Sequence, residues 1–158
     1  MLIGIFSDTH DNINRIKEAV RILKEKEIKN LIHLGDYCSP FSIPLLEIEK
    51  IYAIFGNNDG DKLMLQKRAN ECGFQIVQGP TNLIIEGKNI AIMHEPYQLE
   101  ALRKSNSYDV ILYGHTHEVT IKENPLTINP GELCGYLSGR STFVILDLSS
   151  LKYEIIEI

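Results

Sequence analysis

The first half of the chain alternates short apolar runs with amphipathic segments. Leu2 to Phe6 is an apolar run typical of a strand buried on both faces. From Asn12 to Glu27, apolar residues recur at steps of three and four, which predicts a helix with one buried face. Strands are expected at Asn30–Leu34 and Ile51–Phe55, separated by a short helix that Ser39-Pro40 opens. This half therefore predicts a βαβαβ unit with a parallel sheet.

The pattern changes in the second half. A helix is expected from Lys62 to Cys72, with Asp61 as its N-cap. Glu86-Gly87-Lys88 then separates two apolar runs as the turn of a β-hairpin, so antiparallel pairing is expected to begin there. The remaining elements are expected at Leu99–Lys104 as a helix and at Val110–Tyr113, Thr142–Asp147 and Tyr153–Ile158 as strands. The fold class is therefore α/β, with a mixed sheet system and helices outside.

Composition narrows the class of protein. The 158 residues fit a single domain over 1–158, and 44% hydrophobic with 23% charged residues is ordinary for a globular protein. The net charge is −5 and no segment concentrates Lys and Arg, which makes long nucleic acid a poor partner. Three cysteines without a CxxC pair suit free thiols in a reducing compartment. No apolar run approaches the ~20 residues of a membrane span, so we expect a cytoplasmic protein with no membrane partner.

Potential metal ligands follow the apolar strands. The segments concerned are Ser7-Asp8-Thr9-His10, Gly35-Asp36, Gly56-Asn57-Asn58-Asp59, His94 and Gly114-His115-Thr116-His117. Because the carboxyl ends of strands in an open α/β sheet meet at one edge, we expect these segments to converge. Four of the five histidines fall in them, and only His33 lies inside a strand. A lone histidine is usually structural, but the joint pattern favours one site.

Seven residues are candidate ligands: Asp8, His10, Asp36, Asn57, His94, His115 and His117. They are too many for the four to six positions around one ion, whereas two ions that share a bridging carboxylate would use them all. Imidazole and carboxylate without thiolate suit Mn²⁺, Fe²⁺, Co²⁺, Ni²⁺ or Zn²⁺ rather than Ca²⁺ or structural zinc. Paired ions clamp the oxygens of an in-line phosphoryl displacement, so phosphoester hydrolysis is the expected chemistry. The alternative is that Asp8, Asp36 and Asn57 only cap helices or turns.

In this order, the motifs resemble those of the calcineurin-like metallophosphoesterases, over about residues 1–135. With Asn129-Pro130-Gly131-Glu132 and no inserted cap, the chain is similar to the small prokaryotic phosphodiesterase branch and to the retromer subunit Vps29. The resemblance implies a single-domain sandwich of two mixed β-sheets flanked by helices. It also implies two metal sites that share Asp36 as a bridge: Asp8, His10, Asp36 and His117 for one ion, and Asp36, Asn57, His94 and His115 for the other.

Two positions depart from that pattern. Asn58 stands where many relatives have a His that assists the leaving group, and an amide supplies no acidic proton. Glu95 follows His94 where relatives commonly have Gly, so an extra carboxylate is expected over the substrate pocket. We expect Asn57 and Asn58 to donate amide hydrogen bonds during catalysis, and His115 to lie near the leaving group. Both departures concern the choice of substrate, and neither Asn58 nor Glu95 is a candidate metal ligand.

The expected activity is that of a two-metal phosphodiesterase acting on small phosphodiesters. A metal-bound hydroxide is expected to attack phosphorus in line, with Mn²⁺ as the expected metal and Ni²⁺, Fe²⁺, Co²⁺ or Zn²⁺ as alternatives. The rival hypothesis is a Vps29-like metal-binding scaffold for protein interactions with little or no activity. The complete ligand set favours the enzyme, because a scaffold has no need of clustered carboxylates that repel one another. The oligomeric state stays open, a homo-oligomer included.

Overall fold

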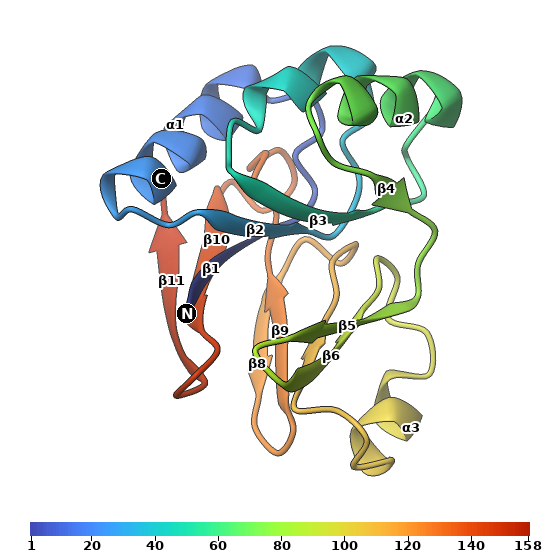
Figure 1. Ribbon diagram of the computed structural model, residues 1–158, viewed down its shortest axis with the longest axis vertical. Helices are drawn as coiled ribbons and strands as arrows, with labels where there is room; N and C mark the ends of the chain where they lie inside the picture. Colours follow the sequence, from blue (N-terminus) through green and yellow to red (C-terminus); the bar gives the residue numbers. More distant parts are fainter.

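A sandwich of two β-sheets forms the centre of the computed structural model, which describes all 158 residues (Figure 1). The strands of the first sheet are, in spatial order, β11 (Lys152–Glu157), β10 (Thr142–Asp147), β1 (Leu2–Phe6), β2 (Asn30–His33), β3 (Lys50–Ile54) and β4 (Ile76–Val77). Those of the second are β5 (Thr81–Ile85), β6 (Lys88–Ile92), β7 (Val110–Leu112), β9 (Leu126–Pro130) and β8 (Val119–Lys122). Both sheets are mixed, which confirms the expected fold class.

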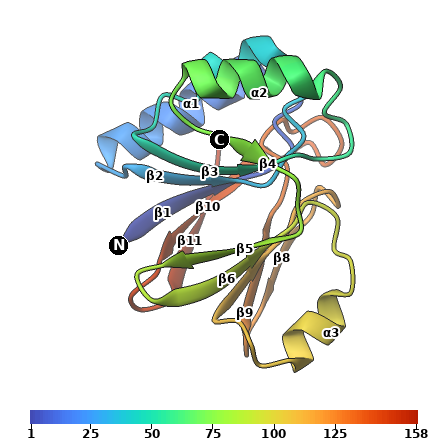
Figure 2. The same ribbon diagram turned by 45° about the vertical axis from the view of Figure 1, so that its right-hand side comes forward.

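Helices cover the outer faces of the sandwich (Figure 2). The first sheet carries α1 (Ile13–Glu25), the 3₁₀ helix η1 (Pro40–Leu45) and α2 (Lys62–Glu71), while the short α3 (Leu99–Lys104) lies against the second sheet. No helix is long and apolar enough to cross a bilayer.

Strand β1 shows why the apolar run at the start of the chain is buried on both faces. Ile3 and Ile5 pack between the two sheets, whereas Phe6 belongs to the core beneath the helices. Gly4 lies under Leu23 of α1, and a Cβ at this glycine would come within 2.7 Å of the leucine side chain. A side chain at position 4 would therefore displace the end of the Leu23 side chain.

The structure confirms most of the expected helix boundaries. Asn12 caps α1, because its side chain accepts a hydrogen bond from the backbone of Arg15, and Asp61 caps α2 in the same way. The first helix ends at Glu25 rather than at Glu27, which has a φ of 55° and leaves the helical region. Here the periodicity of apolar residues predicted the buried face but extended past the end of the helix.

Three strands were not predicted: β4, β8 and β9. Asn129 and Pro130 belong to β9, all five residues of which are buried. After the β5–β6 hairpin, antiparallel pairing recurs in this sheet only between β8 and β9, because β6, β7 and β9 run parallel. The prediction of antiparallel pairing at the Glu86-Gly87-Lys88 turn is therefore confirmed, and the second sheet is mixed, as expected.

The carboxyl ends of the parallel strands in both sheets meet at one edge of the sandwich. Backbone hydrogen bonds join the loops there across the two sheets: Leu133 and Cys134, which follow β9, donate to the carbonyls of Ser7 and Asp8, which follow β1, at 3.0 Å each. The loops that carry the candidate ligands are therefore held together by main-chain bonds.

Candidate metal centre

The structure brings all seven candidate ligands together at this edge, as expected. Asp8 and His10 follow β1, Asp36 follows β2 and Asn57 follows β3. His94 follows β6 in the second sheet, and His115 and His117 follow β7. Their side chains form two groups joined by one carboxylate.

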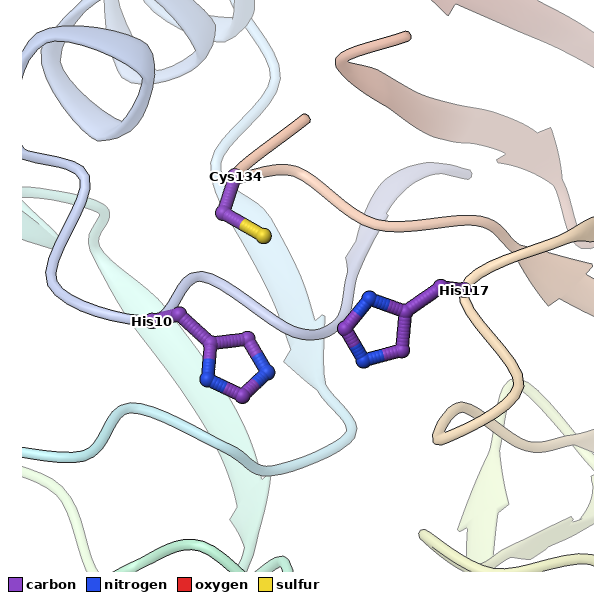
Figure 3. Close-up of side chains that lie close together, drawn as sticks. All are labelled: His10, His117 and Cys134. Atoms are coloured by element: carbon purple, nitrogen blue, oxygen red, sulfur yellow. The ribbon is translucent and has the colours of Figure 1, made fainter. Parts of the chain in front are cut away.

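The first group surrounds Asp8, which is fully buried. Its Oδ1 atom lies 3.3 Å from His117 Nε2 and 3.8 Å from His10 Nε2. Figure 3 shows the rings of His10 and His117 directed toward the same space, and their centroids are 5.2 Å apart. Asp8 Oδ1 and His10 Nε2 are buried atoms without a hydrogen-bond partner. A shared cation would satisfy both atoms, because unpaired buried polar atoms are costly.

The second group surrounds the side-chain oxygen of Asn57. This Oδ1 lies 2.9 Å from His94 Nε2 and 2.9 Å from His115 Nδ1. The other ring nitrogen of His94 lies 2.8 Å from the carbonyl oxygen of Leu34, which can only accept a hydrogen bond. His94 therefore carries a proton on Nδ1, and its Nε2 faces the site.

Asp36 lies between the two groups. Its Oδ2 is 3.4 Å from His10 Nε2 and 3.3 Å from His94 Nε2. Asn58 holds this carboxylate with its backbone nitrogen at 2.8 Å from Oδ1 and its side-chain amide at 2.7 Å from Oδ2. The amide of Asn58 thus binds a carboxylate in this structure instead of pointing freely into the cleft.

The buried carboxylates of the site are not paired with Lys or Arg side chains. Asp8, Asp36, Asp59 and Glu132 are the buried acidic residues, and none has a Lys or Arg nitrogen within 4.0 Å. Burial opposes ionisation of Asp36, but hydrogen bonds from His94 and Asn58 prevail and lower its pKa. The nearby carboxylate of Asp8 raises the pKa of His10. The donor set therefore fits divalent cations, which would supply the missing positive charge.

Two thiols lie beside the ligands. Cys134 falls within 4.8 Å of His10 and His117, and Cys38 Sγ lies 3.2 Å from His10 Nδ1. Burial raises the pKa of each thiol to about 12, which keeps both protonated at neutral pH. Cys134 donates a hydrogen bond to Glu132 at 2.9 Å. Cys134 thus lies next to the candidate ligands His10 and His117, and in the metal-free protein its thiol is bonded to Glu132.

The backbone at the ligands is strained. The five candidate ligands in the left-handed region are Asp8 with φ 53°, His10 with φ 37°, Asp36 with φ 59°, His115 with φ 68° and His117 with φ 62°. Such values are uncommon for residues with a side chain and persist where surrounding contacts enforce them. Their concentration at one edge supports a functional role for these loops.

Glycines in the motifs allow the loops to approach each other. A Cβ at Gly56 would lie 2.1 Å from Asp36 Oδ1, and one at Gly114 would lie 1.9 Å from the hydroxyl of Ser7. Any side chain at Gly56 would therefore displace the carboxylate between the two ligand groups.

Asp59 and Glu132 were not predicted as site residues, yet both organise the site. Asp59 accepts hydrogen bonds from the backbone of Asp36 at 3.2 Å, Tyr37 at 2.7 Å and Gly56 at 2.7 Å, which joins the loop after β2 to the loop after β3. The sequence feature that could have identified Asp59 is its place in the motif that contains Asn57. Glu132 lies beside His117, and its signal was the Pro-Gly pair that precedes it.

Other charged or aromatic candidates lie outside the ligand set. His33 is buried and stacks on Tyr37 with ring centroids 3.9 Å apart, and burial lowers its pKa to about 3. Arg140 pairs with Glu157 at 2.7 Å on the surface.

Comparison with known sequences decides the family. The profile of the calcineurin-like phosphoesterase superfamily domain matches residues 1–151. The chain belongs to this superfamily. It is 39% identical to phosphodiesterase MJ0936 of Methanocaldococcus jannaschii, over 98% of this chain and 97% of that protein. A probable metallophosphoesterase of Methanothermobacter thermautotrophicus is 29% identical over 83% of this chain and 76% of its own length.

Solved structures agree with this family. A structure described as a novel archaeal phosphodiesterase superposes with a TM-score of 0.93, at 37% identity and full coverage of both chains. Vps29 of Cryptosporidium parvum shares the fold with a TM-score of 0.71 at 19% identity, over 99% of this chain and 96% of that one. The calcineurin-like superfamily implies divalent metal ions, and the group of Asp8, Asp36 and His94 and the group of His10, His117 and Cys134 have the spacing to hold one.

Proposed function

We propose that the protein is a metal-dependent phosphodiesterase that hydrolyses small phosphodiesters. The observation that carries the proposal is the convergence of seven potential ligands on buried carboxylates that no Lys or Arg neutralises. The 39% identity to a phosphodiesterase supports it. Two divalent cations in this site would acidify a water molecule and stabilise the charge on the phosphoryl oxygens.

The two groups of side chains suggest the division of ligands. We assign Asp8, His10, Asp36 and His117 to one ion and Asp36, Asn57, His94 and His115 to the other, because Asp36 Oδ2 lies about equally far from His10 and His94. The histidine and carboxylate set suits Mn²⁺ best in our proposal, with Ni²⁺, Fe²⁺, Co²⁺ and Zn²⁺ as alternatives. The free thiols are consistent with a cytoplasmic location.

A cavity beside the second group offers a place for the substrate. It has a volume of about 150 Å³ and is lined by Asn57, His94, Lys62, Glu95 and Tyr97, among others. A cavity of roughly this size accommodates a six-membered ring. We propose that one ester group of the substrate lies here, next to the phosphorus that the ligand groups surround.

The charges in this cavity bear on substrate choice. The Lys62 ammonium group has no carboxylate within 4.0 Å and lies 5.2 Å from the centre of the Phe55 ring, so it can attract the anionic phosphodiester. Glu95 accepts a hydrogen bond from the Tyr97 hydroxyl at 2.8 Å, which holds the extra carboxylate at the cavity. We propose that Glu95 disfavours substrates with additional phosphate groups, because like charges repel.

The catalytic roles of Asn57, Asn58 and His115 are part of this proposal. Asn58 binds Asp36 through its amide and so orients the carboxylate between the two groups. His115 lies 2.9 Å from Asn57 at the side of the site away from His10 and His117, which suits a place near the leaving group. A scaffold of the Vps29 kind is the second candidate, and only measured activity separates the two.

A metal-by-substrate screen tests the proposal. The protein is stripped of metal, loaded with each divalent ion in turn and assayed with bis-p-nitrophenyl phosphate, phosphomonoesters and cyclic nucleotides. We expect hydrolysis of the diester with Mn²⁺, loss of activity on chelation, and a folded chain by circular dichroism in both states. If metal-loaded protein shows no turnover above the metal-only blank on any substrate, the protein is a scaffold and the proposal fails.

A further inference from the structure

Glu132 is a buried carboxylate that the proposed reaction does not use. It follows β9, its exposed fraction is 0%, and six donor groups face its two oxygens. These donors are His117 Nδ1, Cys134 Sγ, the backbone nitrogens of Tyr136, Leu137 and Ser138, and the Ser138 hydroxyl. Nitrogen, sulfur and hydroxyl donors thus surround the carboxylate completely, without a Lys or Arg.

The contact with His117 fixes which ring nitrogen carries the proton. His117 Nδ1 lies 2.7 Å from Glu132 Oε2, and an ionised carboxylate only accepts hydrogen bonds. Nδ1 therefore bears the proton in the neutral ring, and Nε2 presents a lone pair. That lone pair faces Asp8 Oδ1 at 3.3 Å, which is the arrangement of two ligands that await one cation.

The second oxygen of Glu132 holds the following loop. Oε1 accepts hydrogen bonds from the backbone of Leu137 at 2.9 Å and from the hydroxyl of Ser138 at 2.7 Å. The loop between Gly135 and Gly139 leaves the side chains of Tyr136 and Leu137 exposed, so few apolar contacts hold it in place. One carboxylate thus joins this loop to a candidate metal ligand.

We propose that Glu132 is a positioning residue that sets the tautomer and orientation of His117 for metal binding and ties the Gly135–Gly139 loop to this ligand. The proposal rests on the proposed function in one respect, because it takes His117 to be a ligand. Carboxylates that orient metal-bound histidines in this way typically change metal affinity about 10–100-fold when they are lost.

The chemistry of an amide makes the role testable. Glu132→Gln keeps the shape of the side chain but replaces one acceptor oxygen with a donor NH₂ group. Since donors surround both oxygens, the amide must face either His117 or the loop with a donor against a donor. Glu118→Gln is the matched control, because Glu118 is exposed, lies next to His117 in sequence and makes no side-chain hydrogen bond.

The first measurement needs neither activity nor a variant of Glu132. Long-range ¹H–¹⁵N spectra of the metal-free wild-type protein report which ring nitrogen of His117 carries the proton, with His117→Gln used for assignment. We expect the proton on Nδ1. A proton on Nε2 alone would overturn the proposal, and this result does not depend on the folding of Glu132→Gln.

The second measurement compares the affinities of the two metal-binding steps. Titration with Mn²⁺ should show that Glu132→Gln weakens one of two binding steps about 10–100-fold and changes the other less than about threefold. Glu118→Gln should leave both steps unchanged. A merely structural role would lower the melting temperature and weaken both steps equally, and that outcome contradicts the proposal.

A third variant separates the loop from the ligand. Ser138→Ala removes one hydrogen bond to the loop and keeps the contact between Glu132 and His117. We expect both binding steps to stay as in the wild type, whereas a loss as large as that of Glu132→Gln would assign the effect to the loop and overturn the proposal. Because the tautomer and the metal titration do not require turnover, failure of the proposed phosphodiesterase activity would appear separately.

Discussion

Carboxylates at the candidate metal centre and carboxylates on the rest of the surface have different partners. Away from the site, carboxylates are exposed and meet Lys or Arg, as in Lys24–Glu47 at 2.6 Å and Arg140–Glu157 at 2.7 Å. At the site, Asp8 and Asp36 are fully buried and meet imidazoles, amides and backbone nitrogens. No Lys or Arg nitrogen therefore pairs with these buried carboxylates, and Lys62 lines only the neighbouring cavity.

The difference between exposed ion pairs and buried carboxylates indicates which charged groups have a functional role. Exposed ion pairs contribute only about 0–1 kcal/mol each, so they can be exchanged freely. A buried carboxylate without a countercharge is expensive, and evolution toward stability alone would replace it. Asp8 and Asp36 are therefore expected to serve function, whereas the exposed pairs are not.

The largest effect is expected from Asp36→Ala. Because Asp36 lies between the two ligand groups, its loss should reduce the stoichiometry below two ions and lower kcat/KM for a diester by about 10³-fold or more, the scale of several kcal/mol of transition-state stabilisation. Elemental analysis and steady-state kinetics measure both. Asp109→Ala, which removes a carboxylate paired with Lys88 on the surface, should change neither quantity. Two ions still bound to Asp36→Ala would disprove the bridging assignment.

Asn58→His should change activity selectively. Without a general acid, the rate should fall steeply as the pKa of the leaving group rises, and the new histidine should accelerate diesters with poor leaving groups by up to about 10²–10⁴-fold. A series of diesters with graded leaving groups measures the slope at saturating metal. Asn58→Ala is the control, because both variants lose the amide bond to Asp36. Equal slopes in all three proteins would show that position 58 does not face the leaving group.

Removal of metal should lower stability without unfolding the chain. At a free-metal concentration of about 100 times the dissociation constant, binding stabilises the native state by about 2.7 kcal/mol, which corresponds to about 5–10 °C in Tm for a chain of this size. The three hydrophobic clusters contain no candidate ligand, so the fold should survive chelation. Differential scanning calorimetry with and without chelator measures the shift. Cooperative unfolding on chelation at 25 °C would contradict the prediction.

Acid should destabilise the metal-free protein through Glu132. Burial alone would raise the pKa of this carboxyl, but hydrogen bonds from Cys134, Ser138 and His117 lower it to about 2. A depressed pKa in the folded state contributes stability above the unfolded value near 4.5, and this stability is lost as the pH falls toward 2. Denaturant titrations between pH 5 and pH 2 should show a shallower decline for Glu132→Gln than for wild type. Identical slopes would refute the assignment.

The smallest effect is expected on the surface. Lys24→Met breaks an exposed ion pair with Glu47 and should change the free energy of unfolding by less than about 1 kcal/mol. Urea denaturation at low and high salt measures this change, which should shrink further in salt. A loss of several kcal/mol would remove the contrast between surface pairs and buried carboxylates.

The sequence predicted those parts of the fold and the site that local patterns encode. Periodicity predicted the apolar face of α1, and the motifs after the strands predicted that Asp8, Asp36 and His94 would converge. Glu132 could not be assigned, because its role arises from contacts with His117 and with a loop that has no periodic pattern. The strand β9 was missed because buried polar residues such as Asn129 interrupt its apolar signal. The strand β8 has only four residues and none of them is fully buried, so it lacks an apolar run.

The position of β1 has a consequence for how the chain folds as it is made. This strand pairs with β2 on one side and with β10 on the other, and Thr142 of β10 follows Leu2 by 140 residues. On the ribosome, β1, β2 and β3 can associate early, while one edge of β1 stays without its partner until β10 emerges. An open strand edge invites pairing with another nascent chain. Slow translation across residues 34–141 should therefore increase aggregation, and chaperone demand should be greatest before β10 leaves the exit tunnel.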